Sequence, residues 1–204
     1  MMKSVICLVV AAFLAVTANA GIVITEVMPG SLHDTSAANG DWFELTNSGA
    51  TAVNITGWSW VDNSTSHAKL VFPSMTIQAG QSILCLDESA ANAATFRTIW
   101  GIDNSQVILD KTVMGDFHGL GKSGDGVFIY DASNKLVVSY SWANSTDGFS
   151  IDVYGGGASS VIGVNGAYAS SDPIPDVASP FLVPEPATLI ILGLGFVALR
   201  SSKK

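Results

Sequence analysis

The chain has 204 residues, which is enough for one ordinary domain with additional segments at its ends. Apolar residues make up 48% and the mean hydropathy is +0.40, which is high for a water-soluble domain, but the excess lies at the two ends. Between them, residues 21–183 hold 16 acidic and five basic residues, a net charge of −11. Nucleic-acid binding needs clustered Lys and Arg, so this composition argues against it.

The first 20 residues have the three parts of a secretory signal peptide. Lys3 supplies a positive start, residues 5–16 are apolar, and Ala18-Asn19-Ala20 is a small-residue cleavage site. We therefore expect cleavage between Ala20 and Gly21, and export of the chain that follows. No Cys stands at the cleavage point, so a lipoprotein anchor is not indicated.

Short strands dominate the part that follows. Its segments are β-branched or alternate apolar with polar residues, as in residues 41–47, where Phe43 and Leu45 share one face. Turn residues separate the expected strands, which fall at 22–28, 41–47, 53–55, 58–61, 70–73, 75–77, 81–86, 107–109, 127–130, 135–142 and 149–154. One helix is expected over residues 90–100, with Ser89 as its N-cap and Gly101 ending it. The pattern favours an all-β sandwich with one short helix.

The chain therefore divides into four parts. We expect a signal peptide over residues 1–20, a β-sandwich over 21–168, a linker over 169–182, and a hydrophobic tail over 183–204. The linker is suggested by the Gly, Ala and Ser that prevail after residue 155 and by the sequence Asp172-Pro173-Ile174-Pro175.

The tail has three parts in a fixed order: Pro184-Glu185-Pro186, an apolar run over residues 187–199, and a basic end at 200–204. As a helix the apolar run would span about 20 Å, less than the hydrocarbon core of about 30 Å, and the basic end would stay cytoplasmic. The tail resembles the PEP-CTERM sorting signal. That resemblance implies a short transmembrane helix held in the inner membrane until an exosortase-like peptidase acts near the motif, and then a location at the cell surface or in the extracellular matrix.

The order of motifs in the middle resembles the lamin-tail domain, in its exported bacterial type. The matching pieces, spread over residues 21–154, are Ile24-Thr25-Glu26-Val27, Asp41-Trp42-Phe43-Glu44-Leu45-Thr46-Asn47, Ile55-Thr56-Gly57-Trp58, Phe72-Pro73, Ile77-Gln78-Ala79-Gly80-Gln81, Gly124-Asp125-Gly126-Val127 and Asp147-Gly148-Phe149-Ser150. The resemblance implies an immunoglobulin-like β-sandwich that acts as an interaction module without a catalytic site. The loop at 32–40 and the Gly-rich stretch after Tyr154 depart from the family pattern.

Two patterns of catalytic or nucleotide-binding proteins are weak here. Residues 119–124 match GxGxxG, but no helix is expected after them, and Asp116 stands where a phosphate-binding loop needs Gly. The three histidines, His33, His67 and His118, fall in expected surface loops without the donor spacing of a zinc site.

Two carboxylates offer a different possibility. Glu44 lies opposite the face of Phe43 and Leu45, and Glu26 falls on a strand that can neighbour it. Such a pair suits acid–base chemistry or calcium binding, whereas the lamin-tail resemblance favours a Glu44 that bonds backbone groups or a hydroxyl. Cys85 lies in an apolar run and is expected to be a buried thiol.

The combined prediction is an exported, non-catalytic surface or matrix protein that acts as a binding or scaffold module. No catalytic residue, cofactor or metal ligand is assigned, and the expected partners are the sorting peptidase, the membrane through the tail, and an exopolysaccharide or surface protein. The alternative is a carbohydrate-binding module, which an exposed row of the five tryptophans would favour. A metal-dependent hydrolase would require Glu26, Glu44 and a histidine to cluster in a cleft.

Overall fold

The computed structural model describes residues 21–32, 40–115 and 117–182. Three predicted features lie outside these residues: the signal peptide with Ala20, the histidine His33, and the tail with Pro184, Glu185 and Pro186. Within them the protein is built mainly of strands in sheets with two helices, one of a single turn, consistent with an immunoglobulin-like β-sandwich.

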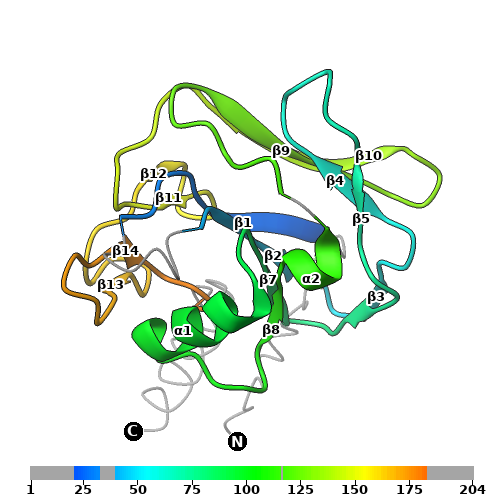
Figure 1. Cartoon of the computed structure of the whole chain (residues 1–204). Coiled ribbons are helices and arrows are strands. Elements are labelled where there is room, and N and C mark those ends of the chain that lie inside the picture. Colours follow the sequence, from blue (N-terminus) through cyan, green and yellow to red (C-terminus); the bar gives the residue numbers. More distant parts are fainter. Residues whose placement is uncertain (1–20, 33–39, 116, 183–204) are drawn as a thin grey trace, which may run out of the picture.

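A six-stranded sheet forms the centre of the molecule, in the order β12-β11-β1-β2-β7-β8 (Figure 1). All its pairs are antiparallel except β7 with β8. Its strands are β1 (Ile22–Met28), β2 (Trp42–Asn47), β7 (Ser82–Leu86), β8 (Val107–Leu109), β11 (Ile151–Asp152) and β12 (Ala158–Ser159). Nearly every residue of β1, β2 and β7 is buried, because both faces of the sheet are covered.

A second sheet covers one of these faces, in the order β10-β9-β4-β5. Its strands are β4 (Ser59–Val61), β5 (Leu70–Val71), β9 (Asp125–Tyr130) and β10 (Leu136–Trp142), and a small pair, β3 (Val53–Asn54) with β6 (Thr76–Ile77), lies beside it. The core between the sheets contains an aromatic cluster in which the Trp60 ring centroid lies 4.8 Å from that of Phe43 and 4.7 Å from that of Phe117.

The other face of the central sheet is covered by helix α1 (Ala90–Trp100) and by what we call the C-terminal segment, residues 168–182. This segment contains β13 (Tyr168–Ala169) paired with β14 (Val177–Ala178). Figure 1 shows the three layers, with α1 and the β13–β14 pair on the side opposite β9 and β10. The second core here includes Met28, Trp42, Leu84, Leu86, Phe96, Trp100 and Ala178.

Helix α1 begins and ends where the sequence predicts. The Ser89 side chain accepts a hydrogen bond from the backbone N–H of Asn92, and Gly101 ends the helix with a left-handed φ of 63°. The unpredicted α2 (Lys111–Met114) is one turn long, capped by the Asp110 side chain, and so short a helix leaves no periodic pattern in the sequence.

The structure differs most from expectation after residue 155. Residues 169–182, where the sequence suggests a linker, are folded onto the domain, and Asp176, Val177, Ala178 and Ser179 are buried. The two strands of this segment are two residues long, and several of its hydrogen bonds reach distant parts of the chain, so neither periodicity nor length marks the strands in the sequence. No helix of the described residues is long and apolar enough to cross a membrane, and the transmembrane helix predicted in the tail lies outside them.

Candidate functional site: a sealed pair of carboxylates

Glu26 and Glu44 lie directly opposite each other on β1 and β2, and each is only 1% exposed. A β-bulge at Thr25 brings them to the same face. Before the bulge Ile24 faces the core between the sheets, and after it Val27 does, so Glu26 turns to the side covered by the C-terminal segment. Without the extra residue, Glu26 would share the face of Ile24.

Glu44 is bound at both oxygens. Its Oε1 accepts a hydrogen bond from Thr25 Oγ1 at 2.6 Å, and its Oε2 accepts one from the backbone N–H of Phe181 at 2.5 Å. Thr25 Oγ1 continues the network to Thr46 Oγ1 at 3.1 Å, and Thr46 Oγ1 lies 2.7 Å from Ser82 Oγ. Glu44 therefore bonds a hydroxyl and a backbone group, as the lamin-tail resemblance implies.

Glu26 is bound through one oxygen. Its Oε1 accepts hydrogen bonds from Ser150 Oγ at 2.5 Å and from the backbone N–H of Ser179 at 2.9 Å, with Ser160 Oγ more distant at 3.4 Å. Its Oε2 is buried and has no hydrogen-bond partner among the described residues. All three of these donors come from residues after 149, in the part of the chain where few strands were expected.

Burial favours the neutral form of both carboxyl groups. Burial raises the pKa of Glu26 from 4.5 to about 7, against the opposing effect of its serine hydrogen bonds. The pKa of Glu44 is raised from 4.5 to about 8, mainly by burial, and the neighbouring Glu26 acts in the same direction. No positive side chain is among the causes of either shift, so protonation is what makes the burial tolerable.

Within the described residues, the pair lacks the additional ligating side chains that the metal-dependent hydrolase alternative requires. No group of three or more His, Cys, Asp or Glu side chains suited to a metal ion occurs in the described parts of the chain. A metal-dependent hydrolase would also need a histidine beside Glu26 and Glu44. No histidine is among their hydrogen-bond partners in the described residues or among the causes of their pKa shifts. The contacts that the structure shows are structural, because the two buried carboxyls join the central sheet to the C-terminal segment.

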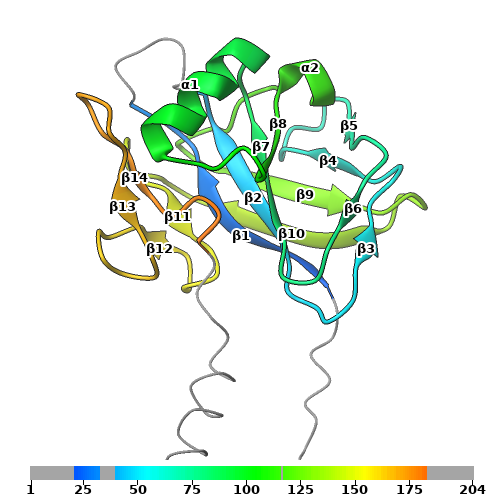
Figure 2. The ribbon, with the colours of Figure 1, turned by 90° about the horizontal axis from the view of Figure 1, so that it is seen from below.

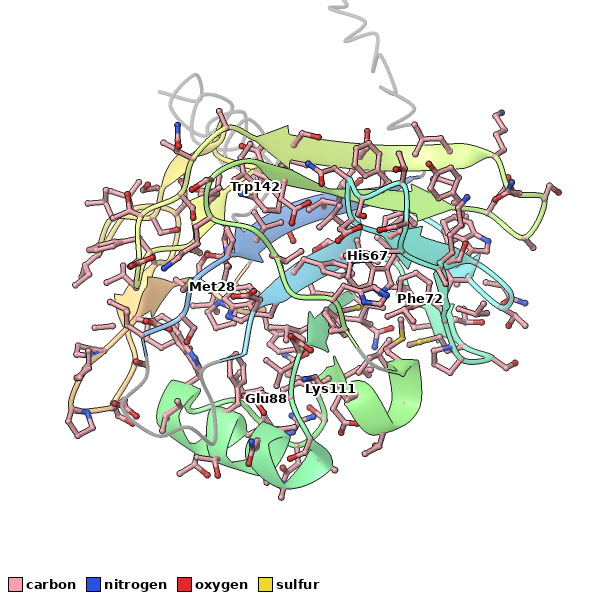
Figure 3. All side chains as sticks on the ribbon, turned by 45° about the horizontal axis from the view of Figure 1, so that its top comes forward. Met28, His67, Phe72, Glu88, Lys111 and Trp142 are labelled. Atoms are coloured by element: carbon pink, nitrogen blue, oxygen red, sulfur yellow. The ribbon has the colours of Figure 1, made fainter. Side chains whose placement is uncertain are left out.

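The structure also brings two of the three histidines into contact. The sequence does not predict this contact. The His67 and His118 rings stack with centroids 3.9 Å apart, and His67 Nδ1 lies 2.6 Å from Asp62 Oδ2. Figure 3 shows His67 near Phe72, apart from Met28 on the covered face of β1. Both histidines lie in loops, as predicted.

The tryptophans do not form an exposed row. Trp42, Trp60, Trp100 and Trp142 are buried, and Trp58 is half-buried against the core between the sheets. Trp142 also donates from Nε1 to the Gly121 carbonyl at 2.9 Å. The feature that would favour a carbohydrate-binding module is therefore missing from the described residues.

The GxGxxG segment is a structural loop. The backbone N–H of Leu120 donates to Asp41 Oδ2 at 2.7 Å, and that of Gly121 donates to Asp125 Oδ2 at 2.6 Å. Strand β9 follows it, where a dinucleotide fold would have a helix. Its amides thus bind the protein's own carboxylates, not a phosphate. Cys85 is a buried free thiol whose pKa is raised by burial.

Comparison with known families agrees with this structure. The family model described as Lamin Tail Domain matches residues 15–144, well over half of the chain. The chain belongs to the lamin tail domain family. The PEP-CTERM protein-sorting motif matches residues 182–204, so both resemblances and their order are confirmed. A search of curated proteins found no match.

These two matches indicate the broad class of function. Neither the lamin tail domain nor the PEP-CTERM motif is an enzymatic family, and the motif supports sorting by an exosortase-like system to the cell surface. The family match ends at residue 144, so Ser150, Ser179 and Phe181, which bind the two carboxyls, come from the part of the chain that follows it.

Proposed function

We propose that this lamin tail domain is a non-catalytic binding or scaffold module that is exported, held briefly in the inner membrane by its tail, and delivered to the cell surface or extracellular matrix. Signal cleavage between Ala20 and Gly21 starts this route, and a peptidase acting near Pro184-Glu185-Pro186 ends it. The observation that carries the proposal is the order of the two families, with the sorting motif directly after the folded domain.

The buried carboxyls support the non-catalytic part of the proposal. A catalytic acid or base must reach its substrate, and Glu26 and Glu44 are each 1% exposed beneath the C-terminal segment.

Replacing Pro184, Glu185 and Pro186 by alanine should trap the protein as a full-length, membrane-bound form in the producing cell. The reason is that the peptidase loses its motif while the apolar run at 187–199 is unchanged. Cell fractionation and immunoblotting measure the effect, with Ser201→Ala/Ser202→Ala as the matched change within the same tail. Release of the motif variant at the normal rate would contradict the sorting role.

The domain of residues 21–182 should show no sugar-reversible retention on the producing organism's own extracellular polysaccharide, because four of its five tryptophans are buried. Co-sedimentation of the purified domain with the polysaccharide tests this. Absence of retention supports a protein partner or a scaffold role. Retention that free sugars reverse would instead support the carbohydrate-binding alternative and make Trp58 its first candidate residue.

A further inference from the structure

The turn between β12 and β13 presents an unusual group of exposed aliphatic side chains. Val161 is 59% exposed, Ile162 62% and Val164 52%. Backbone hydrogen bonds close the turn: the Gly163 N–H donates to the Ala167 carbonyl at 2.8 Å and the Val164 N–H donates to the Val161 carbonyl at 2.9 Å. A hydrogen-bonded turn thus carries three largely exposed aliphatic side chains.

This turn lies where the described chain ends. A Cβ added to Gly166 would be 3.2 Å from Cβ of Leu182, so the base of the turn touches the last described residue. Leu182 is itself 48% exposed. Figure 2 shows the loop between β12 and β13 beside the end of the C-terminal segment.

The distance from this point to the apolar run of the tail is short. Five residue steps separate Leu182 from Ala187, which bounds the distance at about 18 Å even for a fully extended chain. The headgroup zone adds about 5–8 Å on each side of the hydrocarbon core, so the turn can reach it when the run is inserted.

We propose that Val161, Ile162, Val164 and Leu182 dock into the lipid surface while the tail is in the membrane, and so fix the orientation of the domain before it is released. This inference rests on the membrane insertion proposed for the tail. Four aliphatic side chains bind lipid weakly alone, but the tail supplies a high effective concentration at the surface.

The acidic residues near the turn indicate which lipid headgroups it can approach. Residues 136–182 contain four Asp and no Lys or Arg, and Asp152 Oδ2 accepts a hydrogen bond from Asn165 Nδ2 of the turn at 2.7 Å. Docking is therefore driven by apolar insertion, not by attraction to anionic headgroups. It is expected in phosphatidylcholine vesicles and should weaken as anionic lipid is added.

An environment-sensitive fluorophore on the turn tests this directly. Residues 21–204 are produced in the presence of phosphatidylcholine vesicles as Ile162→Cys, with Val137→Cys on β10 as the matched exposed aliphatic control. Cys85 is buried and will not be labelled. Flotation measures insertion of the tail, and emission with quenching by spin-labelled lipid measures docking of the turn.

The expected result is flotation of both variants, with emission at position 162 rising about threefold and being quenched, and emission at 137 unchanged. Flotation without a response at 162 would overturn the docking and leave the sorting proposal standing. Failure to float would overturn both proposals. Equal responses at 162 and 137 would overturn the oriented docking, because the domain would then lie on lipid without a preferred face.

Discussion

Raising the pH from about 5 to about 9 should lower the free energy of unfolding of this domain, on the order of 3 kcal/mol for each of the carboxyls Glu26 and Glu44. Their pKa values are about 7 and about 8 in the folded protein, mainly because burial disfavours the charged form, against an ordinary value of 4.5. The effect is large because no cationic side chain of the described residues is among the causes of either shift, and the hydrogen bonds offset only part of the loss of hydration.

The sign follows from proton binding. Between about pH 4.5 and pH 8 the folded state holds protons that the unfolded state has lost, so stability falls as the pH rises through this window. Below it both states are protonated, and above it both are ionised, so the curve should be flat with respect to these groups. Asp41, whose pKa burial also raises, acts in the same direction.

Glu44→Gln is the variant that separates this cause from others. An amide can accept from the Phe181 N–H and donate to Thr25 Oγ1, but it cannot ionise. Urea unfolding across the pH range should therefore show a shallower decline than in the wild type, and a more stable protein at about pH 9. Equal slopes in the two proteins would contradict the assignment of Glu44 as a buried neutral acid.

Truncation after Gly166 should destabilise the domain by on the order of 5 kcal/mol or prevent its folding. It removes the backbone donors Ser179 and Phe181 from the two carboxyls and uncovers apolar side chains of β1 and β2, among them Met28 and Trp42. It also removes the acceptor for the Leu32 N–H, which bonds Asp176 Oδ1 at 2.8 Å.

Truncation after Leu182 is the matched control, since it removes only residues outside the described structure and should leave the unfolding transition of the domain unchanged. Thermal and urea unfolding compare the two truncated chains. If the chain ending at Gly166 were as stable as the chain ending at Leu182, the C-terminal segment would be a dispensable linker. A chain ending at Gly166 that still folded should also lose the pH dependence, because water would reach Glu26 and Glu44.

Local patterns predicted the regular parts of this protein well. Strand β1 was located from its run of β-branched and apolar residues, β2 from alternation, and helix α1 from capping and helical spacing, because these signals are encoded within a few residues. The assignment of Phe43 and Leu45 to one face of β2 and Glu44 to the other was confirmed for the same reason. The family order and the sorting motif were likewise readable as linear strings.

The sequence predicted the residues of the candidate site but not their arrangement. Two carboxylates on neighbouring strands were expected, but the bulge at Thr25 that turns Glu26 to the face of Glu44 is a register shift between strands. Sequence gives no sign of it, since the bulged residue is an ordinary Thr in a strand-like run.

From the sequence alone, the sorting motif, the lamin tail family and most strands of the central sheet were identified and an export signal was predicted, because each leaves a pattern in short runs of residues. Only the tertiary structure decided what the carboxyls do. Ser179 and Phe181 bind Glu26 and Glu44 from 153 and 137 residues away along the chain. Those bonds use backbone N–H groups, which every residue except proline possesses, so no side-chain pattern marks them, and only the folded path of residues 168–182 brings them to the carboxyls.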